Sequence, residues 1–81
     1  MEEKMIEKQW REFCLACFGN ISEQQYTDLR RTFYGGASTI YFLILNMLDP
    51  GDEPTEADLE KMRGLQAEMH AFNEEVKAGR A

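Results

Sequence analysis

The chain has 81 residues, of which 43% are hydrophobic and 30% charged, and its formal net charge is −6. This length allows one small domain over residues 1–81, and the ordinary balance of apolar and charged residues excludes a disordered chain. The acidic balance argues against direct binding to nucleic-acid phosphates. The sequence shows no signal peptide and no apolar run of transmembrane length, so we expect a cytoplasmic protein with no membrane contact.

The first predicted helix covers about residues 2–18. Apolar residues recur there at helical spacing: Ile6, Trp10, Phe13, Cys14 and Cys17. Glu7 and Arg11 lie four residues apart, which predicts a favourable ion pair on the helix surface. Gly19 follows this segment and tolerates the positive φ that ends many helices.

The second predicted helix, about residues 22–48, is unusually long. Ser22 and Gln25 have the spacing of a capping box, and Pro50 and Gly51 stop the helix at its other end. The aromatic and β-branched residues of the segment Ile40–Leu48 also permit a strand. We favour a helix because the apolar pattern continues there in phase with the pattern that begins at Tyr26.

This long helix is apolar around more of its circumference than one covering face requires. One stripe consists of Tyr26, Leu29, Phe33, Gly36, Ala37, Ile40, Ile44 and Met47, and a second of Arg30, Tyr34, Tyr41, Leu45 and Leu48. We expect the chain itself to cover one stripe and another subunit or a target to cover the other. The small residues Gly35, Gly36 and Ala37 lie within the helix, where each glycine costs about 1 kcal/mol relative to alanine, so we expect them to pack closely against another helix.

The third predicted helix covers about residues 55–78 and begins with a capping box formed by Thr55 and Asp58. Its apolar stripe consists of Leu59, Met62, Leu65, Met69, Phe72 and Val76. The three segments together predict an all-α fold, a three-helix bundle or helical hairpin with a long central helix, assembled into an oligomer.

The sequence gives no sign of catalysis. The Cys-x-x-C pair, Cys14 and Cys17, lacks the second pair of a zinc site and the strand–helix context of a redox motif, so we expect two buried thiols in a reducing compartment. His70, the only histidine, is expected to be exposed, and no nucleophile is spaced with it. We therefore expect no metal, no cofactor and no enzymatic activity.

Two groups of residues are the candidates for binding. The candidate partner-binding residues are Arg30, Arg31, Tyr34, Ser38, Tyr41, Phe42 and Leu45. They are interpreted first as an apolar and aromatic interface with a basic rim, and alternatively as a nucleotide site, since arginine binds phosphate in two-point geometry. The candidate acidic surface consists of Asp49, Asp52, Glu53, Glu56, Asp58 and Glu60. It is read either as the solvated start of a helix or as an imitation of nucleic acid.

The string R-R-T-F-Y-G-G-A at residues 30–37, followed by D-P-G-D-E-P-T-E-A-D-L at residues 49–59, resembles small accessory proteins of tailed phages and their prophages. The resemblance covers about residues 24–76, and alanine often stands in those proteins where this chain has Gly35. It implies a phage protein that acts in the bacterial host cell without catalysis.

Three functions follow from this resemblance and the candidate residues. The first is stoichiometric binding to a host protein by a self-associating chain, as in an anti-CRISPR-like inhibitor of a bacterial anti-phage defence system. The second is an oligomeric sponge that sequesters a nucleotide signal near Arg30, Tyr34 and Ser38. The third is an acidic mimic of nucleic acid.

Overall fold

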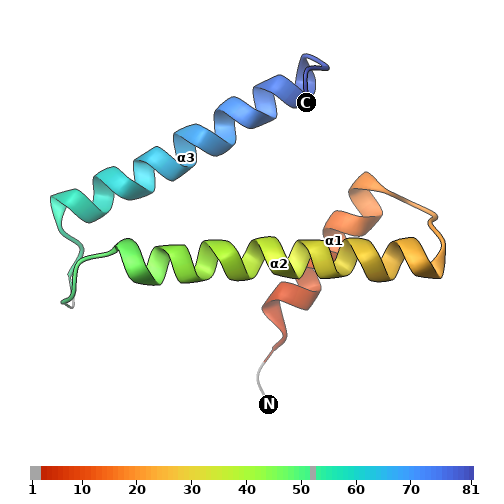
Figure 1. Cartoon of the computed structure of the whole chain (residues 1–81), viewed down its shortest axis with the longest axis horizontal. Helices are drawn as coiled ribbons and strands as arrows, with labels where there is room; N and C mark the ends of the chain where they lie inside the picture. The colour runs from red at the N-terminus through yellow and green to blue at the C-terminus, as the bar shows by residue number, and fades with distance from the viewer. Residues whose placement is uncertain (1–2, 52) are drawn as a thin grey trace. The chain divides into compact units, whose positions relative to one another are not determined.

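The computed structural model describes residues 3–51 and 53–81, which form the helices α1 (Met5–Cys17), α2 (Glu23–Met47) and α3 (Glu56–Lys77) (Figure 1). No strand occurs among these residues, so the helical prediction for the segment Ile40–Leu48 is confirmed. Each helix begins and ends within three residues of its predicted limits. The chain divides into two compact units, Met1–Leu43 and Ile44–Ala81, which are described separately.

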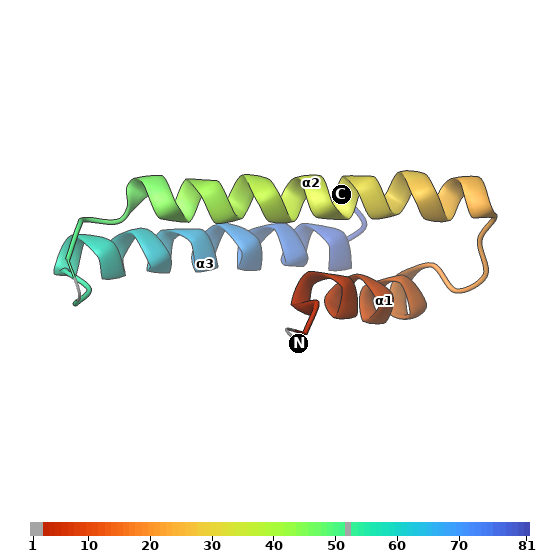
Figure 2. The same cartoon turned by 90° about the horizontal axis from the view of Figure 1, so that it is seen from below.

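The core of the first unit is built around Trp10. Its side chain is fully buried, and its ring lies 5.3 Å from that of Tyr26 and 5.6 Å from that of Phe33. Both α2 residues belong to the predicted inward stripe, and α1 crosses the amino-terminal half of α2 where they lie (Figures 1 and 2). Phe13 adds a further ring contact to Phe33 at 5.4 Å. A cluster of aromatic rings therefore holds α1 to α2.

The indole Nε1 of Trp10 is buried and has no hydrogen-bond acceptor among the described residues. Burial of an unsatisfied N–H group costs about 1–3 kcal/mol. The packing of the Trp10 ring must offset this cost. The contacts of this ring with Tyr26 and Phe33 therefore contribute strongly to the attachment of α1 to α2.

The two cysteines of α1 differ in their surroundings. Cys14 lies one turn from Trp10 and is buried, whereas Cys17 is exposed. The prediction of two buried thiols is thus wrong for Cys17, which is the last residue of α1.

The predicted signals at the end of α1 and at the start of α2 are confirmed. The backbone N–H of Gln25 donates to the Ser22 hydroxyl at 3.1 Å, and the Ser22 N–H donates to the Gln25 side chain at 3.0 Å, which completes a capping box. Gly19 has a φ of 62°, and its N–H donates to the carbonyl of Cys14 at 3.2 Å. A left-handed residue at this point ends α1 and turns the chain toward α2.

In the second unit, Asp58 organises the connection into α3. Its carboxylate accepts from the backbone N–H of Asp49 at 2.7 Å and from that of Thr55 at 3.1 Å, while the Thr55 hydroxyl caps the helix. Asp58 is therefore buried, so its assignment to an exposed acidic surface is wrong. Lys61 adds a hydrogen bond from its ammonium group to the carbonyl of Met47.

The predicted inward stripe of α2 is half-buried in part, at Leu29, Phe33, Ala37, Ile44 and Met47. Its other members, Tyr26, Gly36 and Ile40, are exposed, whereas Tyr34 of the second stripe is half-buried. The residues on the opposite side are exposed, so α2 keeps one largely uncovered face along its length.

We predict that Trp10→Ala lowers the free energy of unfolding by about 3–5 kcal/mol, because it removes the one large side chain that is fully buried among the described residues. Urea unfolding followed by circular dichroism at 222 nm measures the change. Leu15→Ala is the matched control on the same helix, since Leu15 is 77% exposed and its loss is expected to change stability by less than about 0.5 kcal/mol. Equal effects of the two substitutions would contradict the described core.

Candidate functional site

A cluster of polar side chains around Glu7 joins α1 to α2. The Glu7 side chain is only 11% exposed. Its carboxylate accepts from Nε of Arg30 at 3.0 Å and from the Tyr34 hydroxyl at 3.1 Å, and a second Arg30 nitrogen donates to the same oxygen. Arg11 donates to the other carboxylate oxygen at 3.3 Å. Two cations and a phenol thus satisfy one nearly buried carboxylate.

The pKa values follow from this geometry. The hydrogen bond and charge of Arg30 hold the pKa of the Glu7 carboxyl below its ordinary value of 4.5, against the opposing effect of burial. Burial and the hydrogen bond to Glu7 raise the pKa of the Tyr34 hydroxyl. The Arg30 guanidinium also lies 4.9 Å from the centroid of the Tyr34 ring, so the three side chains form one interacting group.

The predicted ion pair between Glu7 and Arg11 is confirmed, with 3.3 Å between Nε of Arg11 and a Glu7 carboxylate oxygen, but its predicted place on the helix surface is wrong for Glu7. Glu7 is buried, and its principal partner is Arg30, which lies 23 residues away in the sequence. A signal for this was present, because Glu7, Trp10 and Cys14 are three and four residues apart and share one face of α1. A carboxylate on an apolar face requires a partner from another element.

The candidate partner-binding residues divide into two groups. Arg30 and Tyr34 are bound to Glu7 within the chain. Arg31, Ser38, Tyr41, Phe42 and Leu45 are exposed, the last three between 56% and 59%. The Tyr41 and Phe42 rings lie 5.5 Å apart in an edge-to-face arrangement. The group available to a partner is therefore mainly apolar and aromatic.

This division bears on the nucleotide alternative. Arg30 donates from two of its nitrogens to the Glu7 carboxylate, and its side chain is 45% exposed. Ser38 lies one turn beyond Tyr34 on α2, and both Ser38 and Arg31 are exposed. Nucleotide binding stays a prediction.

The glycines of α2 face open space. Among the described residues, no heavy atom lies within 4 Å of a Cβ built on Gly35 or on Gly36, whereas Ala37 is half-buried. The expected close packing at the two glycines does not occur among residues 3–51 and 53–81.

The rest of the acidic segment is exposed at Asp49, Glu53, Glu56 and Glu60, while Asp52 lies outside the described residues. Asp49 accepts a hydrogen bond from the Thr55 hydroxyl at 2.7 Å. The Arg63 guanidinium forms ion pairs with two of these acids, at 3.7 Å to a carboxylate oxygen of Glu56 and 3.3 Å to one of Glu60. Several of these acids thus stabilise the start of α3, as carboxylates near a helix amino terminus do.

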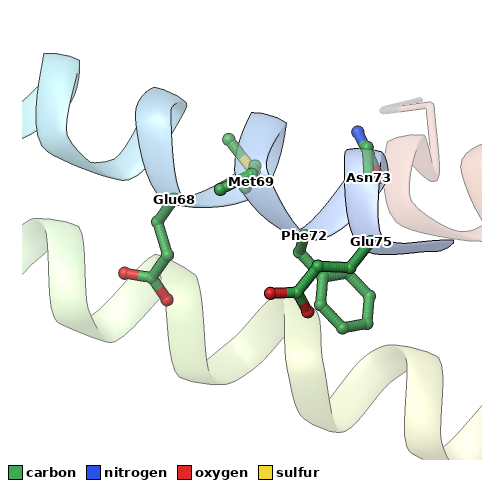
Figure 3. Close-up of a pocket in the computed structure, with 6 residues that line it drawn as sticks. Glu68, Met69, Phe72, Asn73 and Glu75 are labelled. Carbon is green, nitrogen blue, oxygen red and sulfur yellow. The ribbon is translucent and has the colours of Figure 1, made fainter. Parts of the chain in front are cut away.

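The apolar stripe of α3 is mostly exposed, Met69 to 62% and Phe72 to 56%. A hollow of about 530 Å³ lies along this helix, lined by Glu68, Met69, Ala71, Phe72, Asn73 and Glu75. In Figure 3, Glu68, Phe72 and Glu75 project from the same side of α3, so carboxylates flank the Phe72 ring. This surface combines an apolar centre with an acidic border.

No cluster of three or more metal-binding side chains occurs in residues 3–51 and 53–81, and His70 is exposed, as predicted, 4.0 Å from Glu74. Over the same residues, no helix has both the length and the apolar character that crossing a bilayer requires.

Comparison of the chain with models of known protein families, with curated proteins and with solved structures finds no match.

We predict that acid releases α1 from α2 by protonating Glu7. The folded-state pKa of Glu7 lies below its unfolded value, so this stabilisation is complete above about pH 4.5 and disappears as the pH falls through the folded value. Glu7→Gln is expected to lower stability at neutral pH and to flatten the acid dependence. The emission of Trp10, the only tryptophan, measures the release.

The matched control is Glu12→Gln, which neutralises an exposed carboxylate on the same helix. It is expected to leave the acid transition of Trp10 emission unchanged. The assignment to Glu7 fails if both variants keep the wild-type transition.

Proposed function

We propose that the protein acts without catalysis, by stoichiometric binding to another protein through helical apolar surfaces. The observation that carries this proposal is the balance between covered and uncovered side chains. Among the described residues, the buried apolar side chains are Trp10 and Cys14, whereas sixteen large apolar side chains are exposed. A large share of exposed apolar side chains is typical of proteins that bind other proteins.

The chemistry of the surfaces indicates the partner. Tyr41, Phe42 and Leu45 offer aromatic and aliphatic contacts on α2, and Met69 and Phe72 offer them on α3 beside carboxylates. A complementary protein surface has apolar side chains bordered by Lys or Arg. The similarity of residues 30–37 and 49–59 to phage accessory proteins makes a protein of the bacterial host the proposed target, and a component of an anti-phage defence system the specific candidate.

We predict that the tagged chain, expressed in a bacterial host and purified gently, retains one host protein at a fixed ratio. The intact mass of the complex, measured by native mass spectrometry, gives that ratio. The variant Met69→Gln/Phe72→Gln is expected to reduce the retained partner at least about tenfold, because it removes two exposed anchors while glutamine preserves the helix.

Leu15→Gln is the matched control, since it changes a side chain that is even more exposed but lies on α1. It is expected to retain the partner as the wild type does. Equal retention by all three proteins, or bound protein at no fixed ratio, would argue against the proposal.

A further inference from the structure

The uncovered face of α2 carries a regular seam of five residues. Arg31, Gly35, Ser38, Phe42 and Leu45 follow one another at alternating steps of four and three residues, and all five are exposed. This spacing places them in one line on a helix and is the spacing by which two helices interlock side chains. The seam excludes Tyr26 and Phe33, the α2 residues whose rings contact Trp10 of α1.

After Arg31, the seam continues with two small residues and ends with two large ones. Gly35 and Ser38 precede the level of Ile40, while Phe42 and Leu45 follow it. Gly35 and Leu45 are equally distant from residue 40, and so are Ser38 and Phe42. A second copy running in the opposite direction, aligned at Ile40, therefore sets each small residue against a large one.

The space needed for this arrangement is open. No heavy atom of the described residues lies within 4 Å of a Cβ at Gly35, while Phe42 and Leu45 are 58% and 56% exposed. Glycine within a helix is less stable than alanine, and no contact among the described residues offsets this at Gly35. The open space at Gly35 leaves room for a leucine side chain of a second helix.

The charges at the ends of the seam agree with the antiparallel direction. Arg31 and Asp49 are also equally distant from residue 40, and both are exposed. Antiparallel pairing brings Arg31 of each copy toward Asp49 and the carboxyl end of α2 of the other, where the helix dipole is negative. Parallel pairing instead sets Arg31 against Arg31.

We propose that α2 pairs with α2 of a second copy of this chain, antiparallel and with a two-fold axis at the level of Ile40. The seam is self-complementary, as an interface between identical chains related by a two-fold axis requires. The inference rests on the proposed function only in that both assign the uncovered apolar surface to protein contacts. It leaves the exposed face of α3 for the host protein.

Size-swapped variants of the purified full chain test the pairing by native mass spectrometry and sedimentation. Gly35→Leu is expected to weaken the dimer at least about tenfold, because leucine then meets leucine, and Leu45→Ala is expected to weaken it to a similar extent. The combination Gly35→Leu/Leu45→Ala restores the size match and is expected to recover most of the affinity. If Gly35 has no role, added leucine instead leaves association unchanged or strengthens it.

Cysteine cross-linking tests the direction, in a Cys17→Ser background that removes the exposed native thiol. The variant Gly35→Cys/Leu45→Cys is expected to form a covalent dimer. Gly35→Cys alone is expected to form none, because the two copies of residue 35 lie about 15 Å apart along an antiparallel pair, beyond disulfide reach. A covalent dimer from Gly35→Cys alone indicates parallel pairing and overturns the proposal.

Circular dichroism and Trp10 emission confirm that each variant keeps its helices, which is expected because the substituted positions face away from α1. A wild-type chain that stays monomeric yet retains its host partner would overturn the pairing and leave the proposed function intact. A stable dimer that retains no host protein would support the pairing and contradict the proposed function.

Discussion

The main constraint on this structure is that the chain buries only a small part of its apolar surface. Trp10 is the one large side chain that is fully buried among the described residues, and it is held by rings from α2. The Glu7 cluster adds a polar tie beside it. These contacts attach α1 to one face of α2 and leave the opposite face uncovered. The pairing we propose uses that uncovered face, and the function we propose uses the exposed apolar side chains of α3.

The helices and their ends were predictable from the sequence because the signals are local. Ser22 with Gln25 and Thr55 with Asp58 form the capping boxes that their spacing predicted. The inward stripe of α2 was predictable for the same reason, since helical periodicity alone decides which residues share a face. These features require no knowledge of which elements meet.

The errors arose where a side chain finds a partner far away in the sequence. Glu7 was assigned to the surface because Arg11 lies one turn away, but Arg30 and Tyr34 come from another helix. Asp58 was counted as part of an acidic surface, yet the backbone N–H of Asp49 reaches its carboxylate and buries it. Local spacing shows that a contact is possible, and only the fold shows which contact is made. The contacts of Asp58 also weaken the interpretation of the acidic segment as a nucleic-acid mimic, because this carboxylate binds backbone N–H groups of the chain itself.

Sedimentation equilibrium of the unmodified chain, over concentrations from about 1 to 100 µM, reports by mass whether another copy covers α2. We expect a species of about 19 kDa, twice the 9.4 kDa chain mass, or an even multiple of the chain. A single species of 9.4 kDa at every concentration, with α2 fully helical, would contradict it.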